Sequence, residues 1–289
     1  MMKDIRTLKI DSGDIESLNS QEYYLLMELE DFVNNNLEEE RYDDSSCIYF
    51  DHEDGKVVSL SLVSCHLSSV PSVVWKFAML KDLDLDRNAI ENIPDTIEKL
   101  KFLEVLSISD NKLKSFPEPI TRVTSLQSLN LADNNIVSMP SSVGRLELLH
   151  HLALSNNRLK TLPESIGGLK SLRTFRLDDN DLEILPEGFG RLIALTETTL
   201  RNNRLKTLPE SIGNLKNLRS FDLANNCLES LPATIGEMES LKTLWLGGNR
   251  LKELPNSIAN LKLLRTIRLA GNPLEYIPEA LIKESIKIL

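Results

Sequence analysis

The amino-acid sequence predicts an α/β solenoid, in which the chain coils through ten similar turns and each turn adds one strand to a parallel sheet. The first observation is that prolines recur every 23 residues from Pro71 to Pro278. The second is that residues 158–180 return at 204–226 with 17 of 23 positions identical. The third is that leucines alternate with other residues ahead of each proline, as expected of a short strand with one buried face. A fixed period in this range is typical of repeat architectures.

Each copy follows the pattern L-x-x-L-x-L-x-x-N-x-L-x-x-L-P-x-x-I-x-x-L-x-x. On this motif the chain resembles a leucine-rich repeat protein, and ten copies cover residues 57–289. The LPxxI ending is similar to the 23-residue class of cytosolic Ras-pathway scaffold proteins and of plant and prokaryotic intracellular leucine-rich repeat proteins. The resemblance implies a horseshoe with its parallel sheet on the concave face. It also implies a role in protein binding, often as a scaffold in signalling.

The geometry of the repeat independently predicts that the sheet lies inside a curve. Strands stack about 4.8 Å apart, whereas a helical return segment needs a width of roughly 10 Å. An asparagine six residues before each proline is expected to pair backbone groups that a buried turn leaves without partners. This Asn column comprises Asn88, Asn111, Asn134, Asn157, Asn180, Asn203, Asn226, Asn249 and Asn272. Cys65 holds the same place in the first copy.

The leucines and isoleucines of the pattern are predicted to form the core, and one copy departs from this rule. Thr198 stands in a leucine position of the seventh strand. We therefore expect Thr198→Leu to stabilise the protein.

Composition divides the chain into two segments. Residues 1–56 carry 16 acidic and 5 basic side chains, whereas residues 57–289 carry 27 and 28, and we interpret them as an acidic N-terminal cap and the solenoid. The net charge of −10 supplies no basic field for nucleic acid. The first 17 residues, with charges every few positions, are not expected to form a signal peptide, no run is long enough for a membrane span, and there are only three irregularly spaced cysteines. It predicts a cytoplasmic monomer that binds neither nucleic acid nor membrane.

Caps are expected at both ends because a solenoid exposes apolar core there. A helix is predicted over residues 19–38, with Asn19 and Glu22 as a capping box. Its buried face is predicted to contain Leu25, Leu29, Phe32 and Val33. CIYF, the turn DHEDG and VVSLSL predict a hairpin over 47–62 that leads into the first strand. The alternative is that the acidic segment docks a partner.

The C-terminal stretch PEALIKESIKIL departs from the repeat, with Glu284 where a leucine belongs. We interpret it as a short final helix that ends the stack. The tenth strand is then predicted to be the edge of the sheet, where Arg265 and Arg268 discourage pairing with another chain.

No combination of residues predicts catalysis, a cofactor or a metal site. The stretch GGLKS at 167–171 lacks the spacing of a phosphate-binding loop. His150 and His151 are adjacent on a strand and are expected to point to opposite sides, so that they do not share a metal. Cys65 and Cys227 lie seven turns apart, roughly 34 Å at the strand spacing, which excludes a disulfide between them. The protein is therefore expected to be non-enzymatic.

Three positions in each copy are expected to face the concave wall, because they alternate with the buried leucines. They lie twelve, ten and eight residues before the proline, and their side chains vary from copy to copy. Since folding does not dictate this variety, we interpret it as the record of a binding partner. The candidate partner-binding residues are Trp245, Arg268, Arg176, Arg201, Asp222, Glu197, Asp82, Asp84 and Asp86.

These candidates form two patches. Asp82, Asp84 and Asp86 make an acidic patch, but a straight strand does not wrap around calcium, which needs about six to eight oxygen ligands. Trp245 lies among small residues that are expected to leave its ring uncovered, and an exposed tryptophan beside arginine is typical of interface hot spots. In the alternative interpretation, Trp245 only shields the sheet between a salt-linked Asp222 and Arg268.

The favoured function is a non-enzymatic module that binds a protein or peptide on its concave face. Trp245 would be the anchor, and Arg176, Arg201 and Arg268 would meet acidic groups. The alternative function is a structural spacer or assembly module that acts through its ends or its convex side.

Overall fold

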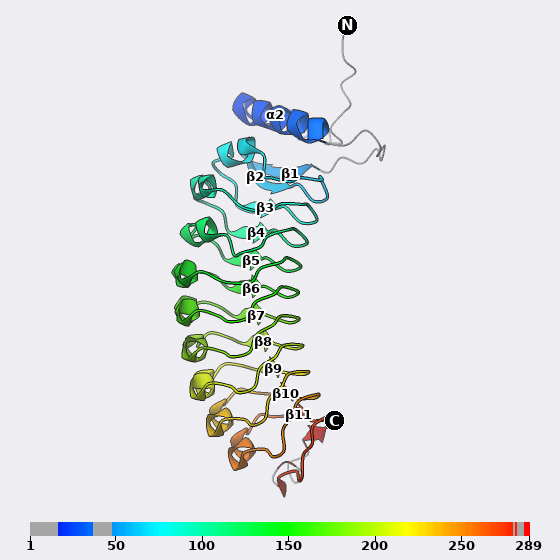
Figure 1. Ribbon diagram of the computed structural model, residues 1–289. Helices are drawn as coiled ribbons and strands as arrows, with labels where there is room; N and C mark the ends of the chain where they lie inside the picture. The colour runs from blue at the N-terminus through cyan, green and yellow to red at the C-terminus, as the bar shows by residue number, and fades with distance from the viewer. Residues whose placement is uncertain (1–16, 37–47, 280, 282–285) are drawn as a thin grey trace.

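The computed structural model describes residues 17–36, 48–279, 281 and 286–289. Figure 1 shows an elongated stack in which each coil of the chain adds one strand to a single long sheet. The twelve strands follow one another in chain order from β1 to β12, and the sheet stays open. This arrangement confirms the predicted solenoid with its parallel sheet.

The repeat strands are short, and each pairs in parallel with the strand 23 residues further along the chain. The central residue of each three-residue strand is buried. The strands are β2 (Lys56–Ser61), β3 (Asp82–Asp84), β4 (Val105–Ser107), β5 (Ser128–Asn130), β6 (His151–Ala153), β7 (Thr174–Arg176), β8 (Glu197–Thr199), β9 (Ser220–Asp222), β10 (Thr243–Trp245) and β11 (Thr266–Arg268).

The chain returns on the other side through five-residue 3-10 helices. Each begins directly after a repeat proline, which cannot donate to a sheet ladder because it has no N–H. Within the described residues they are η1 (Ser72–Lys76), η2 (Asp95–Lys99), η3 (Glu118–Arg122), η4 (Ser141–Arg145), η5 (Glu164–Gly168), η6 (Glu187–Arg191), η7 (Glu210–Asn214), η8 (Ala233–Glu237) and η9 (Asn256–Asn260).

Glycines let neighbouring 3-10 helices approach one another closely. A Cβ atom on Gly144 would lie 2.5 Å from the carbonyl oxygen of Ser165, and one on Gly213 would lie 2.5 Å from that of Thr234. Because these returns are narrower than the helices assumed from the sequence, the two sides of the stack differ less in width. Figure 1 accordingly shows a gentle bend with the 3-10 helices on the outer side.

The leucine columns form one continuous core, and Thr198 belongs to it. Thr198 is 1% exposed, and its hydroxyl donates to the carbonyl of Phe175 at 2.9 Å. Its neighbours in the ladder are Phe175 and Phe221, both fully buried. The small threonine thus lies between two side chains larger than leucine, which changes the expected effect of Thr198→Leu from stabilising to overpacking.

The Asn column makes the predicted hydrogen bonds between turns. In Asn157, the side-chain oxygen accepts the N–H of Ile136 at 2.9 Å. The side-chain nitrogen donates to the carbonyls of Leu131 at 2.9 Å and Leu154 at 3.1 Å. Each such asparagine therefore joins two turns of the chain, and all members of the column are buried except Asn88 and Asn272, which are half-buried.

Helix α2 (Ser20–Asn36) ends the stack, as Figure 1 shows, and residues 37 and 38 of the predicted helix lie outside the described residues. Three of the four predicted face residues are buried: Leu25, Leu29 and Val33. The prediction was wrong for Phe32, which is 37% exposed, while Leu26 is buried instead. The helix packs on η1, whose Trp75 is 5% exposed.

Only half of the predicted capping box forms. The side-chain oxygen of Asn19 accepts the N–H of Glu22 at 3.1 Å. The Glu22 carboxylate instead accepts the N–H of Val57 at 3.3 Å and lies 3.6 Å from Nζ of Lys56. The backbone and side-chain amides of Asn19 both donate to the carbonyl of Gly55, at 3.1 and 2.7 Å. Glu22 therefore ties the helix to the first strands rather than to its own cap.

The predicted hairpin forms from β1 (Tyr49–Glu53) and β2, with an irregularity between Asp51 and His52. Its turn is shorter than the predicted DHEDG and consists of Asp54 and Gly55, with φ of 50° and 72°. This Asp-Gly pair takes the left-handed conformation that two-residue hairpin turns require.

The C-terminal prediction needs correction. Strand β12 (Lys287–Ile288) pairs in parallel with β11, so that β11 is not the sheet edge. The N–H of Leu289 donates to the carbonyl of Ile267 at 3.0 Å and extends this pairing. The predicted final helix involves residues 280 and 282–285, which lie outside the described residues.

The cysteines differ in state. Cys65 is buried and disulfide-bonded, whereas Cys227 is a free thiol. Structural disulfides are typical of oxidising compartments. This bond therefore argues against the reducing setting inferred from the cysteine spacing, and Cys47 lies outside the described residues.

Candidate functional site

The structure divides the candidate residues into two groups on the face of the sheet opposite the core. The acidic group is Asp82, Asp84 and Asp86, on and just after β3. The second group lies on or next to β7 to β11: Arg176, Glu197, Arg201, Asp222, Trp245 and Arg268. The end residues of a strand point away from the core because only its central residue packs into it.

Four of the candidates line one cavity of about 470 Å³: Arg201, Asp222, Trp245 and Arg268. Ala224 and Gly247 leave this space open because their side chains are small. Arg176 and Glu197 do not line it and lie further along the sheet, on β7 and β8. The cavity is large enough to receive a side chain from another molecule.

Trp245 ends β10, between Asp222 on β9 and Arg268 on β11. Its ring is half-buried, and Cζ of Arg268 lies 5.2 Å from the ring centroid, within cation–π distance. The ring is therefore less open than its small neighbours in the sequence suggested. No ion pair within 4.0 Å joins Asp222 to Arg268 in the described part of the chain, so the salt link of the alternative interpretation is not formed.

Asp222 is 6% exposed, and burial raises the pKa of its carboxyl above the ordinary value near 3.8. The charge of Asp178 raises that pKa further, whereas the N–H of Ala224 and the charges of Arg201 and Arg268 lower it. Because burial is the largest of these effects, the charged form of the Asp222 carboxyl is less stable in the folded protein than it would be in water. The two arginines compensate it only in part.

The acidic group is bound into the sheet on one side and open on the other. Asp86 accepts the hydroxyl of Ser107 and the N–H of Ser109, both at 2.6 Å. Burial raises the pKa of Asp82 and of Asp84, and the neighbouring carboxylates raise that of Asp84 further. Asp84 accepts the N–H of Asp86 at 3.0 Å, and this bond and the charge of Arg87 offset part of the rise in its pKa. Asp86 therefore serves the structure, whereas no cation lies within 4.0 Å of the Asp82 or Asp84 carboxylate in the described residues.

The sequence analysis missed a fourth column of this surface, which lies thirteen residues before the repeat proline. In the C-terminal half it is almost entirely basic, and we call Arg173, Arg219, Lys242 and Arg265 the basic stripe. The signal was present in the phrases LRTFRL, LRSFDL, LKTLWL and LRTIRL, whose second residue comes just before the strand. It was overlooked because only positions in strict alternation with the leucines were considered.

The remaining sequence features that could suggest metal binding, phosphate binding or a membrane span have the following places in the structure. Residues 17–36, 48–279, 281 and 286–289 contain no group of three or more metal-ligating side chains placed to hold an ion. The ring centroids of His150 and His151 lie 6.4 Å apart. Lys170 donates to the carbonyl of Gly167 at 2.6 Å. None of the helices in these ranges is long and hydrophobic enough to span a membrane.

Comparison with known proteins identifies the repeat. The family described as a leucine-rich repeat region matches residues 119–203 and 198–271, and a leucine-rich repeat family matches residues 78–136. No curated protein matches the sequence.

Several solved structures are similar to this chain. A leucine-rich repeat protein of Leptospira interrogans is 36% identical with a TM-score of 0.72, over 76% of this chain and 56% of that one. The ectodomain of the Arabidopsis thaliana receptor kinase GASSHO1/SCHENGEN3, in complex with CASPARIAN STRIP INTEGRITY FACTOR 2, is 30% identical with a TM-score of 0.74. That match covers 96% of this chain and 34% of the receptor.

The plant peptide hormone receptor RGFR1, in complex with RGF2, is 30% identical with a TM-score of 0.67, over 79% of this chain and 37% of the receptor. This chain thus spans about half the length of the bacterial protein and about a third of each receptor. The repeat pattern, the stacked fold and these matches agree, and the chain belongs to the leucine-rich repeat family.

Proposed function

We propose that this protein is a non-enzymatic module that binds a protein or peptide on the concave face of its sheet. The observation that carries the proposal is the cavity beside Trp245, where an aromatic ring, two arginines and a buried carboxylate converge. Two of the similar plant receptors are complexes with RGF2 and CASPARIAN STRIP INTEGRITY FACTOR 2, which supports a protein-binding role for this fold.

Each residue of the second group has a proposed role. Trp245 anchors the partner through apolar contact, and Arg268 over its ring offers a guanidinium that a carboxylate can pair with. Arg201 adds a second cation at the cavity, and Arg176 and Glu197 extend the surface along the sheet. Asp222 orders the two arginines, because its charged form is stabilised by them.

The acidic group supports a second contact at the far end of the same face. Asp82 and Asp84 are half-buried carboxylates that a cation from the partner would neutralise. A partner that reaches both groups would bring opposite charges to the two ends of the sheet. Such complementarity selects the partner and its orientation more than it adds affinity.

The test is capture by purified bait protein followed by quantitative mass spectrometry. Trp245→Ala combined with Arg268→Ala should lose the partners that the unchanged bait enriches, with little change in melting temperature. Arg145→Ala combined with Arg191→Ala, on the convex side, is the matched control and should retain them. Equal enrichment by the first variant would reject the concave face as the binding surface.

The alternative function is a structural spacer or assembly module that acts through its ends or convex side. A second cavity of about 530 Å³ on the convex side favours it, since both cations (Arg145, Lys170 and Arg191) and carboxylates (Glu118 and Glu164) line that space. Self-association that survives the concave variant but not the convex one, measured by sedimentation velocity, would support this alternative. We propose a monomer, which predicts no self-association of either kind.

We also propose that residues 1–56 cap the solenoid rather than dock a partner. The fully buried Leu29 supports this, because α2 covers the first turn with it. Leu29→Ala should lower the free energy of unfolding by about 2–5 kcal/mol. A docking role predicts instead an unchanged melting temperature and weaker partner capture.

Its place in the cell is part of the proposal, and two observations compete. The cysteine spacing favours the cytoplasm, where the family resemblance implies a role in signalling or scaffolding, whereas the disulfide at Cys65 favours an oxidising compartment. Thiol labelling of the denatured protein, extracted from its native cell without reductant, decides between them. A cytoplasmic protein should label at both Cys65 and Cys227, and one from an oxidising compartment should label at Cys227 but not at Cys65.

A further inference from the structure

In the basic stripe, Arg219, Lys242 and Arg265 stand on consecutive turns of the chain, and Arg173 stands two turns before Arg219. The N–H of Lys242 donates to the carbonyl of Arg219 at 2.9 Å, and that of Arg265 donates to the carbonyl of Lys242 at 2.8 Å. The N–H of Lys287 then donates to the carbonyl of Arg265 at 2.9 Å. Since strands stack about 4.8 Å apart, the backbone itself holds these four cationic residues side by side.

Nothing in the described chain neutralises this stack. Within residues 17–36, 48–279, 281 and 286–289, no carboxylate lies within 4.0 Å of a basic-stripe nitrogen. Arg219 and Arg265 are exposed and Lys242 is half-buried. Like charges on directly neighbouring strand residues destabilise a sheet, so folding alone does not account for the stripe.

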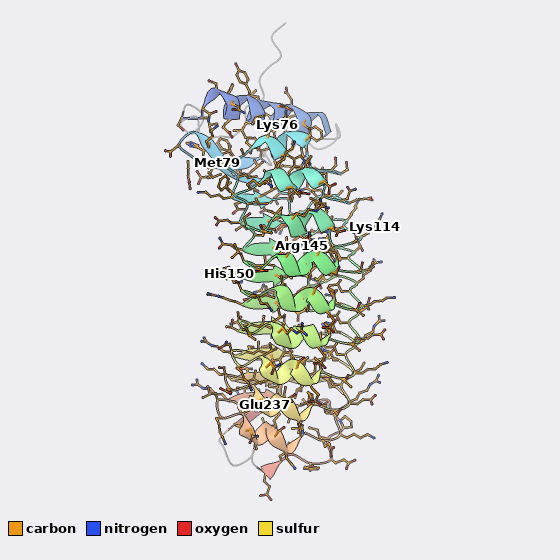
Figure 2. The ribbon with its side chains drawn as sticks, turned by 90° about the vertical axis from the view of Figure 1, so that its left-hand side faces the viewer. Lys76, Met79, Lys114, Arg145, His150 and Glu237 are labelled. Atoms are coloured by element: carbon orange, nitrogen blue, oxygen red, sulfur yellow. The ribbon has the colours of Figure 1, made fainter. Side chains whose placement is uncertain are left out.

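On the opposite flank the charged residues alternate in sign, which is the arrangement that stabilises neighbouring strands. Three residues before the repeat proline, the chain alternates in sign, and we call this column the alternating flank: Lys160, Glu183, Lys206, Glu229, Lys252 and Glu275. Its neighbours are also joined through the backbone, as in the 3.2 Å bond from the N–H of Glu229 to the carbonyl of Lys206. Figure 2 shows the two flanks through Lys114, from the column of the alternating flank, and His150, from that of the basic stripe.

We propose that the basic stripe, which directly precedes the strands that end in Trp245 and Arg268, binds an acidic segment of a protein partner. Carboxylates of that segment would supply the negative charge that the stripe lacks. This inference rests on the proposed function, because it names the chemistry of the partner that the concave face holds. It also extends the binding surface from the concave face onto one flank.

A protein segment fits this surface better than a uniform polyanion such as a nucleic acid. Glu197 is exposed among the arginines of the sheet, and Asp222 lies beside the cavity. A phosphate backbone would bring negative charge to these carboxylates as well. A polypeptide can place a cation or a neutral side chain there and fill the cavity next to Trp245 with an apolar one.

The test uses the full chain and a fluorescent oligo-glutamate peptide of about eight residues, which at roughly 3.3 Å per residue spans the stripe. Binding is followed by anisotropy at about 50 mM salt and again at about 300 mM, where charge interactions are screened. An oligo-glutamine peptide of the same length and oligo-thymidylate serve as comparison probes.

Two triple variants carry equal changes of net charge. Arg219→Gln, Lys242→Gln and Arg265→Gln remove three of the four cations of the basic stripe, whereas Lys160→Gln, Lys206→Gln and Lys252→Gln remove three cations from the alternating flank. We expect the stripe variant to weaken oligo-glutamate binding by at least about tenfold and the flank control by less than about twofold. Thermal melts establish that both variants are folded.

Equal weakening by the two variants would overturn the inference, because net charge would then explain binding. Tighter binding of oligo-thymidylate than of oligo-glutamate, or equal binding of oligo-glutamine, would overturn the chemistry of the partner. If the stripe variant binds oligo-glutamate unchanged while the Trp245→Ala, Arg268→Ala variant loses binding, the stripe is not the binding surface. The concave site would then bind the peptide without it. Failure of the proposed function is read separately, from bait capture.

Discussion

The two flanks of the sheet both stack charged residues on neighbouring turns. On one flank the charges alternate in sign, whereas on the other they are all positive. On the alternating flank, Lys206 lies between Glu183 and Glu229. On the basic stripe, Lys242 lies between Arg219 and Arg265. The first flank is what stability favours, and the second is what stability disfavours. The comparison teaches that a column of like charges, which departs from the alternation that stabilises the sheet, marks the surface we propose for binding another molecule.

The Asn column extends the comparison to the interior, because its side chains supply hydrogen-bond partners to backbone groups of neighbouring turns. Asn157→Ala should lower the free energy of unfolding by about 1–3 kcal/mol for each buried group left without a partner. Urea denaturation measures the change. Asn214→Ala, at an exposed residue of η7, is the control and should be nearly neutral. A small effect at Asn157 would show that the column does not hold the turns together.

Thr198 sharpens the comparison inside the core, because it breaks the leucine pattern in a place where its two ladder neighbours are phenylalanines. Thr198→Leu should destabilise by about 1–3 kcal/mol, because the two flanking phenylalanines already occupy the space. Adding Phe175→Leu and Phe221→Leu should recover much of that loss, since the column is then leucine throughout. A rise in melting temperature for Thr198→Leu alone would restore the expectation from the sequence.

One substitution on each flank tests the comparison itself. Lys242→Glu should raise the free energy of unfolding by about 0.2–1 kcal/mol, because it turns a row of like charges into an alternating one. Lys206→Glu should lower it by a similar amount, because it turns an alternating row into three carboxylates. Both effects should shrink in high salt. Equal signs for the two variants would break the comparison.

Asp222 predicts a smaller, pH-dependent effect. Because its folded-state pKa is raised from about 3.8 by burial, the folded protein binds the proton more tightly than the unfolded chain, and stability falls as pH rises from about 3.8 through the folded pKa. Asp222→Asn removes this penalty and should raise the melting temperature at pH 7. The difference should vanish below about pH 3.8, where both forms are neutral. A gain that persists there would assign it to another cause.

Much of the fold could be predicted because the 23-residue period is a global signal. The strand positions, the Asn column and the cap helix follow from residues such as Leu152, Asn157 and Leu29, whose burial the pattern requires. The 3-10 returns could not be predicted, because they depend on contacts between glycines such as Gly144 and the next turn. The fate of Glu22 depends likewise on Val57, a residue distant in sequence.

The candidate site was predictable in its columns and less so in its details. Alternation with leucine placed Trp245 on the concave side, but the position of Arg268 over its ring depends on side-chain packing that a pattern does not contain. The basic stripe was missed because Arg219 and Lys242 stand one residue before the strand, outside strict alternation. Reading every column of a repeat for the order of its charges would have found it.

The surface formed by the basic stripe, Trp245 and Arg268 is proposed to bind an acidic segment of a partner. The two tryptophans of the chain allow a direct test of this proposal. Trp75 is buried under the cap helix, whereas Trp245 ends β10 beside Arg268, three residues after Lys242 of the basic stripe. Two-dimensional NMR should therefore resolve two indole N–H signals during titration with oligo-glutamate. The account predicts that only the Trp245 signal shifts and saturates. Binding with an unmoved Trp245 signal, or equal shifts of both, would contradict it.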